Sequence, residues 1–124
     1  MPVSFGYRDE ENQRINNILK KLMSLVTVPG SWDEPTFDSE LKRLTLTRDD
    51  LFMISDDELL LYLVRYHFDF ENMEGFADVL VQLAAKANLQ PLREKALAVY
   101  NHIQKENNVF SFGINSKINA LRNK

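Results

Sequence analysis

The two histidines, His67 and His102, are the side chains in this sequence best suited to acid–base or metal chemistry. His67 precedes Asp69 and Glu71 in a segment that is expected to be leaving a helix. His102 and Glu106 are four residues apart and would share one helical face. A metal site needs about three or four converging ligands. The His102 segment offers two, and the geometry of the groups near His67 is undefined where the helix ends. We therefore interpret His67 as a helix-end residue and His102 as part of a surface ion pair, and we predict no metal and no cofactor.

Two pairs of neighbouring acids, Asp49–Asp50 and Asp56–Asp57, could suggest catalysis by paired carboxylates. Each pair instead follows a residue that is suited to begin a helix, Thr47 in the first case and Ser55 in the second. Acids in a first turn interact favourably with the helix dipole, so both pairs are interpreted as helix starts. The glycines stand singly rather than in a phosphate-binding loop, and no nucleophile-elbow pattern is present. We predict no catalytic residues and a non-enzymatic protein.

Length and composition indicate one folded domain. The 124 residues are 44% apolar and 27% charged, which is typical of a globular chain with a single core. Cysteine is absent, which excludes disulfides and fits a reducing compartment. The longest apolar run, residues 59–64, falls far short of the roughly 20 residues that span a membrane, and residues 1–13 lack the apolar centre of a signal peptide. We expect one soluble cytoplasmic domain, residues 1–124, with residues 1–8 flexible and no membrane contact.

Charge is distributed unevenly along the chain. Residues 33–78 carry four bases and thirteen acids, whereas residues 79–124 carry seven bases and two acids, within a net charge of −3. This asymmetry indicates attraction between parts of one domain, or between copies of the chain. Nucleic-acid binding is not expected, because the pI is about 5.4 and the C-terminal bases are dispersed over three segments. These bases are Lys86, Arg93, Lys95, Lys105, Lys117, Arg122 and Lys124.

Apolar residues recur at helical spacing along most of the chain, so the elements that would position these side chains are helices. Residues 9–27 form the first such segment, and the Pro29–Gly30 pair ends it. A shorter helix is predicted over residues 33–44, with Pro35 in its first turn, and Thr47 would open one or two further turns. Trp32 is expected at the edge of the core.

The second half of the chain is also predicted to be helical. Ser55 and Glu58 form a capping box that opens a helix reaching about His67. This helix is apolar nearly all round, which predicts a central and mostly buried position. Helices follow over residues 71–87 and from Pro91 to about residue 104, and a last helix is capped by Ser111. We therefore expect an all-α compact bundle of five to six helices, without a sheet.

Residues 77–108 resemble one tetratricopeptide unit, which is an antiparallel helix pair of about 34 residues. Leu80 stands at the family's first large anchor, and Leu83 and Ala84 stand at its Leu-Gly pair. Ala96 stands at its small residue in the second helix, and Tyr100 stands at its large aromatic position. The resemblance implies a closely packed hairpin at the C-terminal end of the bundle.

The chain departs from the tetratricopeptide pattern at three positions. Ile103 falls where a small residue is usual, Ala87 replaces an aromatic, and Asn108 replaces the closing proline. Only one unit is visible, and an array would need about three units to bury their faces. The whole layout is similar to a small bacterial protein family with a tetratricopeptide-like C-terminal half, which also opens with an amphipathic helix and has a short Leu-Thr-Leu segment followed by Asp-Leu.

Three functional hypotheses follow from the sequence. The first is a protein–protein interaction or scaffold domain, because the resemblance implies a partner-binding face on the first helix of the pair, at Asp78, Val81, Ala85 and Asn88. The second is a self-assembling homodimer formed by the first helix and the opposed charges. The third is an enzyme or small-ligand protein, which would need a deep pocket near Tyr62, Tyr66 or His67 with a converging acid.

Overall fold

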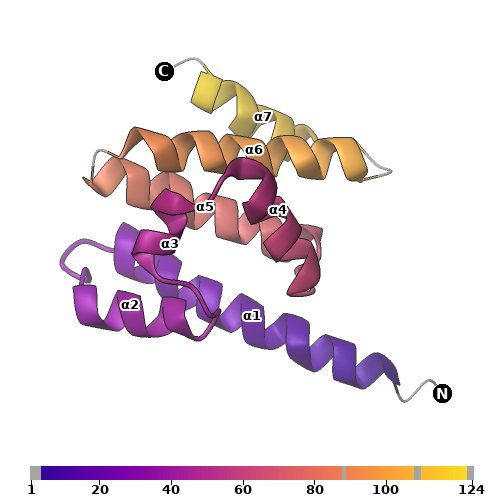
Figure 1. Cartoon of the computed structure of the whole chain (residues 1–124), viewed down its shortest axis with the longest axis horizontal. Helices are drawn as coiled ribbons and strands as arrows, with labels where there is room; N and C mark the ends of the chain where they lie inside the picture. The colour runs from indigo at the N-terminus through magenta and orange to yellow at the C-terminus, as the bar shows by residue number, and fades with distance from the viewer. Residues whose placement is uncertain (1–3, 88, 108–109, 123–124) are drawn as a thin grey trace.

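The computed structural model describes residues 4–87, 89–107 and 110–122, with side chains except at residues 4–9 and 87. These ranges form seven α-helices and contain no strand (Figure 1), which confirms the all-α bundle and exceeds the five to six helices expected. None of these helices is long and apolar enough to cross a membrane. The helices are α1 (Ser4–Thr27), α2 (Glu34–Lys42), α3 (Arg48–Met53), α4 (Asp56–Arg65), α5 (Phe70–Ala87), α6 (Gln90–Glu106) and α7 (Phe112–Arg122).

Helix α1 begins at Ser4, earlier than the predicted start at residue 9. No proline follows Pro2 in this region, and extending an existing helix is far easier than starting one. The acids that were taken as the helix start therefore lie within the helix. The predicted flexible segment, residues 1–8, lies partly outside the described residues, and the remainder from Ser4 is helical.

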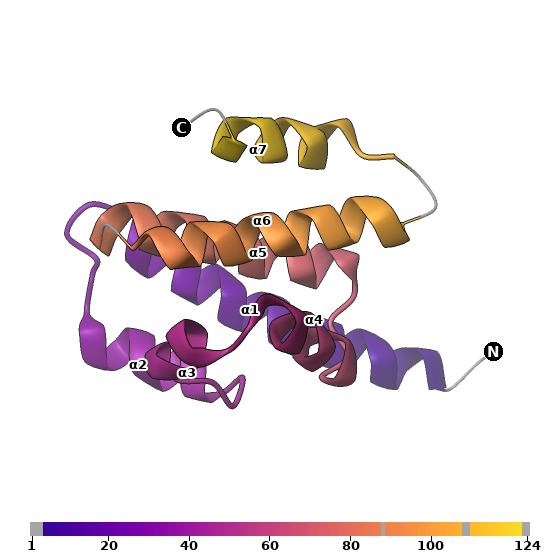
Figure 2. The ribbon, with the colours of Figure 1, turned by 45° about the horizontal axis from the view of Figure 1, so that its top comes forward.

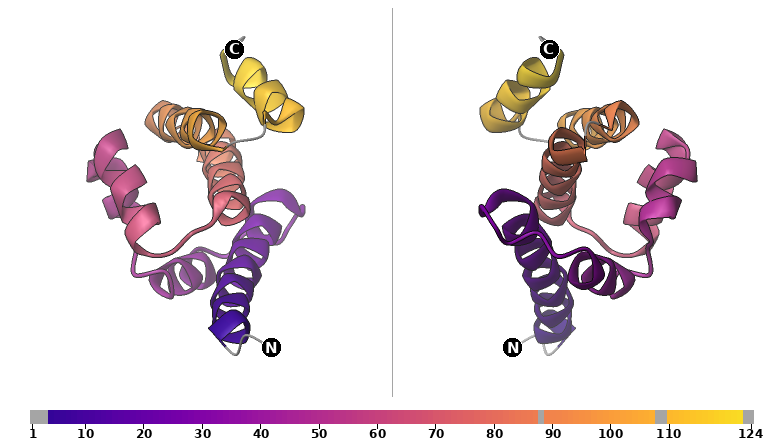
Figure 3. Two further views of the ribbon diagram at one scale, coloured as in Figure 1. Left: turned by 90° about the vertical axis from the view of Figure 1, so that its right-hand side faces the viewer. Right: turned by 90° about the vertical axis from the view of Figure 1, so that its left-hand side faces the viewer.

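The helices are arranged around the α5–α6 pair. Helices α1, α5 and α7 run in one direction and α6 runs in the opposite direction (Figures 1 and 2). Helix α5 contacts α6 most extensively and α1 next, while α7 packs on α6. Helices α2, α3 and α4 form a second wall, on the opposite side of the α5–α6 pair from α7 (Figure 3).

Helix α5 is the most deeply embedded helix, with buried side chains facing both of its long neighbours. Its contact with α1 is close at Gly75, where an added Cβ would lie 3.2 Å from Leu19 Cδ1. The predicted apolar stripe of α1 is buried, and Ala96 of α6 is fully buried beside α5. The buried residues of α5 are Asn72, Met73, Phe76, Ala77, Val79, Leu80, Leu83 and Ala84. Burial of each large aliphatic side chain stabilises the fold by about 1.5–3 kcal/mol.

Local capping signals place the three short helices as the sequence predicts. Pro35 lies in the first turn of α2, whose N-cap Asp33 accepts a hydrogen bond from Thr36 N at 3.1 Å. Thr47 forms a capping box with Asp50 at the start of α3. Ser55 and Glu58 form the predicted capping box of α4. These reciprocal bonds satisfy the free amides of helices that are too short to be stable alone.

The predicted central position of α4 is wrong. Only Leu59 and Leu63 are buried, whereas Leu61 and Val64 are each 51% exposed. Helix α4 lies in the outer wall, because the longer helices α1, α5 and α6 occupy the centre of the bundle. An all-apolar helix indicates burial but does not determine how many neighbours the fold provides.

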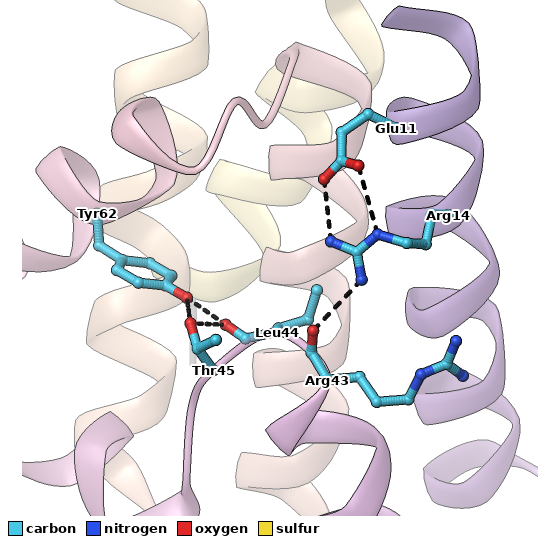
Figure 4. Close-up of polar contacts among 6 residues, drawn as sticks. All are labelled: Glu11, Arg14, Arg43, Leu44, Thr45 and Tyr62. Carbon is cyan, nitrogen blue, oxygen red and sulfur yellow. Dashed lines mark hydrogen bonds and ion pairs between the residues drawn. The ribbon is translucent and has the colours of Figure 1, made fainter. Parts of the chain in front are cut away.

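The loop between α2 and α3 is fastened to both sides of the bundle (Figure 4). Arg14 of α1 donates a hydrogen bond to the carbonyl of Arg43 at 3.4 Å and forms an ion pair with Glu11. Tyr62 of α4 donates to the carbonyl of Leu44 and also bonds the Thr45 hydroxyl. Burial raises the pKa of the Tyr62 hydroxyl. The second wall is thus held in place by polar contacts as well as by its apolar faces.

Replacing His67 by glycine tests the turn that follows α4. His67 has a φ of 66°, and its amide and that of Phe68 bond back to Val64 and Leu63 in a Schellman-type helix ending. Left-handed backbone costs an L-residue roughly 1 kcal/mol, so His67→Gly should raise the free energy of unfolding by about 1 kcal/mol in urea titrations. Gly30→Ala is the matched control, because Gly30 has a φ of 78° and open space around it, and this change should lower stability. A loss of stability in His67→Gly would contradict this interpretation.

Candidate functional site

The predicted partner-binding face on α5 is partly engaged by the chain itself. Asp78 accepts a hydrogen bond from the Tyr100 hydroxyl at 2.5 Å and contacts Lys117 Nζ at 3.0 Å. Val81 packs against the core, Ala85 is exposed, and Asn88 lies outside the described residues. The binding role of these four residues stays a prediction, but Asp78 has a structural role in this arrangement.

Lys117 fastens α7 to the α5–α6 pair. Its ammonium lies 2.6 Å from Glu74 Oε2, bonds both oxygens of Asp78, and is 5.9 Å from the centre of the Tyr100 ring. Burial lowers the pKa of Lys117, but the bonds to Glu74 and Asp78 outweigh it, so the net pKa is raised. Burial, and then the bond to Asp78, raise the pKa of Tyr100 far above its ordinary value. Ile114 and Ile118 of α7 are buried, and Ser111 caps the helix as predicted, accepting a hydrogen bond from Ile114 N at 3.1 Å.

A large concave surface lies between the α2–α3 wall and the α5–α6 pair. We call it the interlayer groove, and its volume is about 980 Å³. Its apolar lining includes the buried side chains of Leu51, Leu83 and Leu92, and Phe52 lies at its edge with 41% exposure. The remaining lining residues are Trp32, Glu34, Pro35, Asp38, Ser39, Lys42, Thr47, Arg48, Asp49, Lys86 and Leu89.

Trp32 is the most distinctive side chain of the interlayer groove. Its ring packs at 5.2 Å from the ring of Phe37, which is fully buried, so the indole has a rigid support. Lys86 Nζ lies 5.5 Å from the centre of the same ring, on the α5 side. Cation–π contact orients Lys86 without neutralising it, so this side of the groove keeps a positive charge.

The opposite wall of the interlayer groove carries paired charges. Arg48 Nε lies 2.7 Å from Asp38 Oδ1, and Arg48 Nη1 lies 3.1 Å from Glu34 Oε2. Asp49, in the first turn of α3, has no ion pair among the described residues. Lys42 also lines this wall and has no ion pair in the same ranges, so charges of both signs border the apolar floor. An apolar floor with charged borders suits an amphipathic segment rather than a neutral small molecule.

A smaller cleft of about 460 Å³ brings together the two histidines that the sequence analysis treated separately. His67 and Asp69, from the α4–α5 turn, face His102 and Glu106 of α6 across it. Among the described residues, no group of three or more histidines and acids is placed to hold a metal ion. Tyr62 and Tyr66 stack on each other at 5.3 Å and do not line this cleft. The two histidines and the two acids line one cleft, and no ion pair joins them among the described residues.

The alkaline stability of the chain tests the polar contacts beneath α7. The folded pKa values of Tyr100 and Lys117 are both raised above the ordinary values of 10.0 and 10.5. A raised folded pKa gives stability that is complete below the unfolded value and is lost as pH rises above it. We expect the free energy of unfolding to fall as pH rises above 10.0, and to fall less steeply in Tyr100→Phe, when urea titrations are compared across pH. Parallel profiles for the two proteins would contradict the burial of the Tyr100 hydroxyl.

The interlayer groove was not predicted from the sequence, although the sequence contains a partial signal for it. Trp32 is the only tryptophan and follows a Pro-Gly turn, while Phe52 and Met53 lie together on a helix too short to bury both. The acid pairs lie in the first turns of α3 and α4, as predicted. Comparisons of the chain with known protein families, with curated proteins and with solved structures give no match.

Proposed function

We propose that the chain is a non-enzymatic protein–protein interaction or scaffold domain, and that the interlayer groove is its docking surface. The observation that carries this proposal is the apolar floor, with Trp32 and Phe52 at its edges. Aromatic side chains supported by a rigid core are the usual anchors of protein interfaces, because they bury a large area at little conformational cost.

Docking would follow the pattern of an amphipathic segment laid in a groove. Apolar side chains of the partner would pack on Leu83, Leu92 and Leu51, and charged side chains would align with the two sides of the groove. Lys86 and Asp49 lie on opposite sides and would fix the direction of the segment. The apolar contacts supply the affinity, and the charges supply the orientation.

A tetratricopeptide-like surface on the α5–α6 pair is the second part of this proposal. Burial of Leu80, Ala96 and Tyr100 supports this part of the proposal, because the resemblance assigns these residues to the packing positions of such a pair. We favour the interlayer groove over the α5 face as the docking surface, because Asp78 already bonds Tyr100 and Lys117. A partner on the α5 face would have to compete with α7 for this carboxylate.

Affinity capture with matched variants tests the docking surface. Wild-type chain, Phe52→Asp and Leu61→Asp would be immobilised in turn, and the proteins captured from a cell extract would be compared by mass spectrometry. Phe52 lines the groove and Leu61 does not, although the two are similarly exposed at 41% and 51%. We expect a protein that wild type and Leu61→Asp capture and that Phe52→Asp loses, since a buried aspartate in the interface would be unpaired.

Ala85→Asp is the corresponding variant for the α5 face, because Ala85 is exposed on that face. If this variant loses the captured protein while Phe52→Asp keeps it, the partner binds the α5 face, and the groove is not the docking surface. If all variants capture the same proteins as wild type, the proposal of a docking surface on either face is wrong.

A further inference from the structure

We propose that the occupant of the interlayer groove is a second copy of the same chain, in which the exposed edge of α3 enters the groove of its partner. This inference rests on the proposed function and names the partner of that same site. Three features support it: an unpaired apolar edge, a groove that accepts it, and opposite charges on the two.

The edge of α3 is apolar and unusually exposed. Leu51 points into the core with 2% exposure, whereas Phe52 is 41% exposed and Met53 is 84% exposed. Two large neighbouring apolar side chains on a six-residue helix are costly to leave in water, and such patches mark contact surfaces. We call Phe52 and Met53 the α3 edge.

Acids surround the α3 edge. Asp49 precedes it in α3, and Asp56 and Asp57 follow it in the first turn of α4. All three are exposed, and none of them forms an ion pair with any residue in the described ranges. The α3 edge is therefore a small apolar surface that is bordered by negative charges.

The interlayer groove carries unpaired positive charge on both of its sides. Lys86 of α5 contacts the Trp32 ring and no carboxylate among the described residues. Lys42 of α2 also lines the groove and has no ion pair in the same ranges. These two lysines complement the acids that border the α3 edge.

The proposed contact gives a closed dimer with two-fold symmetry. Phe52 belongs both to the α3 edge and to the lining of its own groove, so the α3 edge and the groove are adjacent parts of one surface. A two-fold axis through such a surface places each α3 edge in the groove of the other copy. Both α3 edges are then buried in one closed contact.

Trp32 provides the readout, because it is the only tryptophan of the chain and lines the groove. The full chain would be diluted over a wide concentration range while its mass is measured by sedimentation and the emission of Trp32 is recorded. We expect a dimer at high concentration, a monomer on dilution, and a shift of the Trp32 emission to longer wavelength with the same midpoint. Raised salt should move this midpoint to higher protein concentration.

The paired substitution Phe52→Asp with Met53→Asp should give a monomer at every concentration. Both side chains point outward, so the fold should remain intact, which circular dichroism would verify. Leu61→Asp on α4 is the matched control and should dimerise as wild type does. A dimer that persists in the paired variant would overturn the inference, because contact would then occur through another surface.

A wild-type chain that stays monomeric throughout would also overturn this inference. The proposed function would survive that result if capture of another protein still depended on Phe52, since the groove would then bind a different partner. If the chain neither dimerises nor captures another protein through Phe52, both proposals are wrong. The dimerisation and capture experiments therefore test the two proposals separately.

Discussion

The close packing of α5 between α1 and α6 is the constraint on which the rest of the structure depends. Gly75 lets α1 approach until Leu19 fills the space that a side chain would occupy. Ala84 and Ala96, both buried, are the small residues of the α5–α6 pair. With three long helices packed this closely, the shorter helices α2, α3 and α4 can only cover the remaining face of the core.

The interlayer groove follows from this arrangement of long central helices and short covering helices. Helices α2, α3 and α4 are short, and each has its own N-cap, so they cover the core in three separate pieces. The space left between α2–α3 and the α5–α6 pair is the interlayer groove. Hydrogen bonds from Arg14 and Tyr62 hold the loop between α2 and α3 in this position. A surface that is already ordered is suited to binding, because little conformational entropy is lost when a partner docks. The groove and the α3 edge beside it therefore arise from one structural cause.

Local signals in the sequence predicted the local structure well. The capping boxes at Thr47 and Ser55, the prolines in the first turns, and the apolar stripes of α1, α5 and α6 each depend on neighbours within a few residues. The position of α4, the convergence of His67 with His102, and the interlayer groove depend on which helices meet in space. No spacing in a single sequence encodes those distances, so the sequence could predict the helices but not the site between them.

Hydrogen–deuterium exchange of the full chain, compared at low and high protein concentration, tests most directly where docking occurs. Occupancy of the interlayer groove predicts that added protection at high concentration is confined to α3 and to the segments of α2, α5 and α6 that line the groove. Added protection that appears instead on α1 and α7, with α3 unchanged, would contradict the claim that the interlayer groove receives a second copy of this chain.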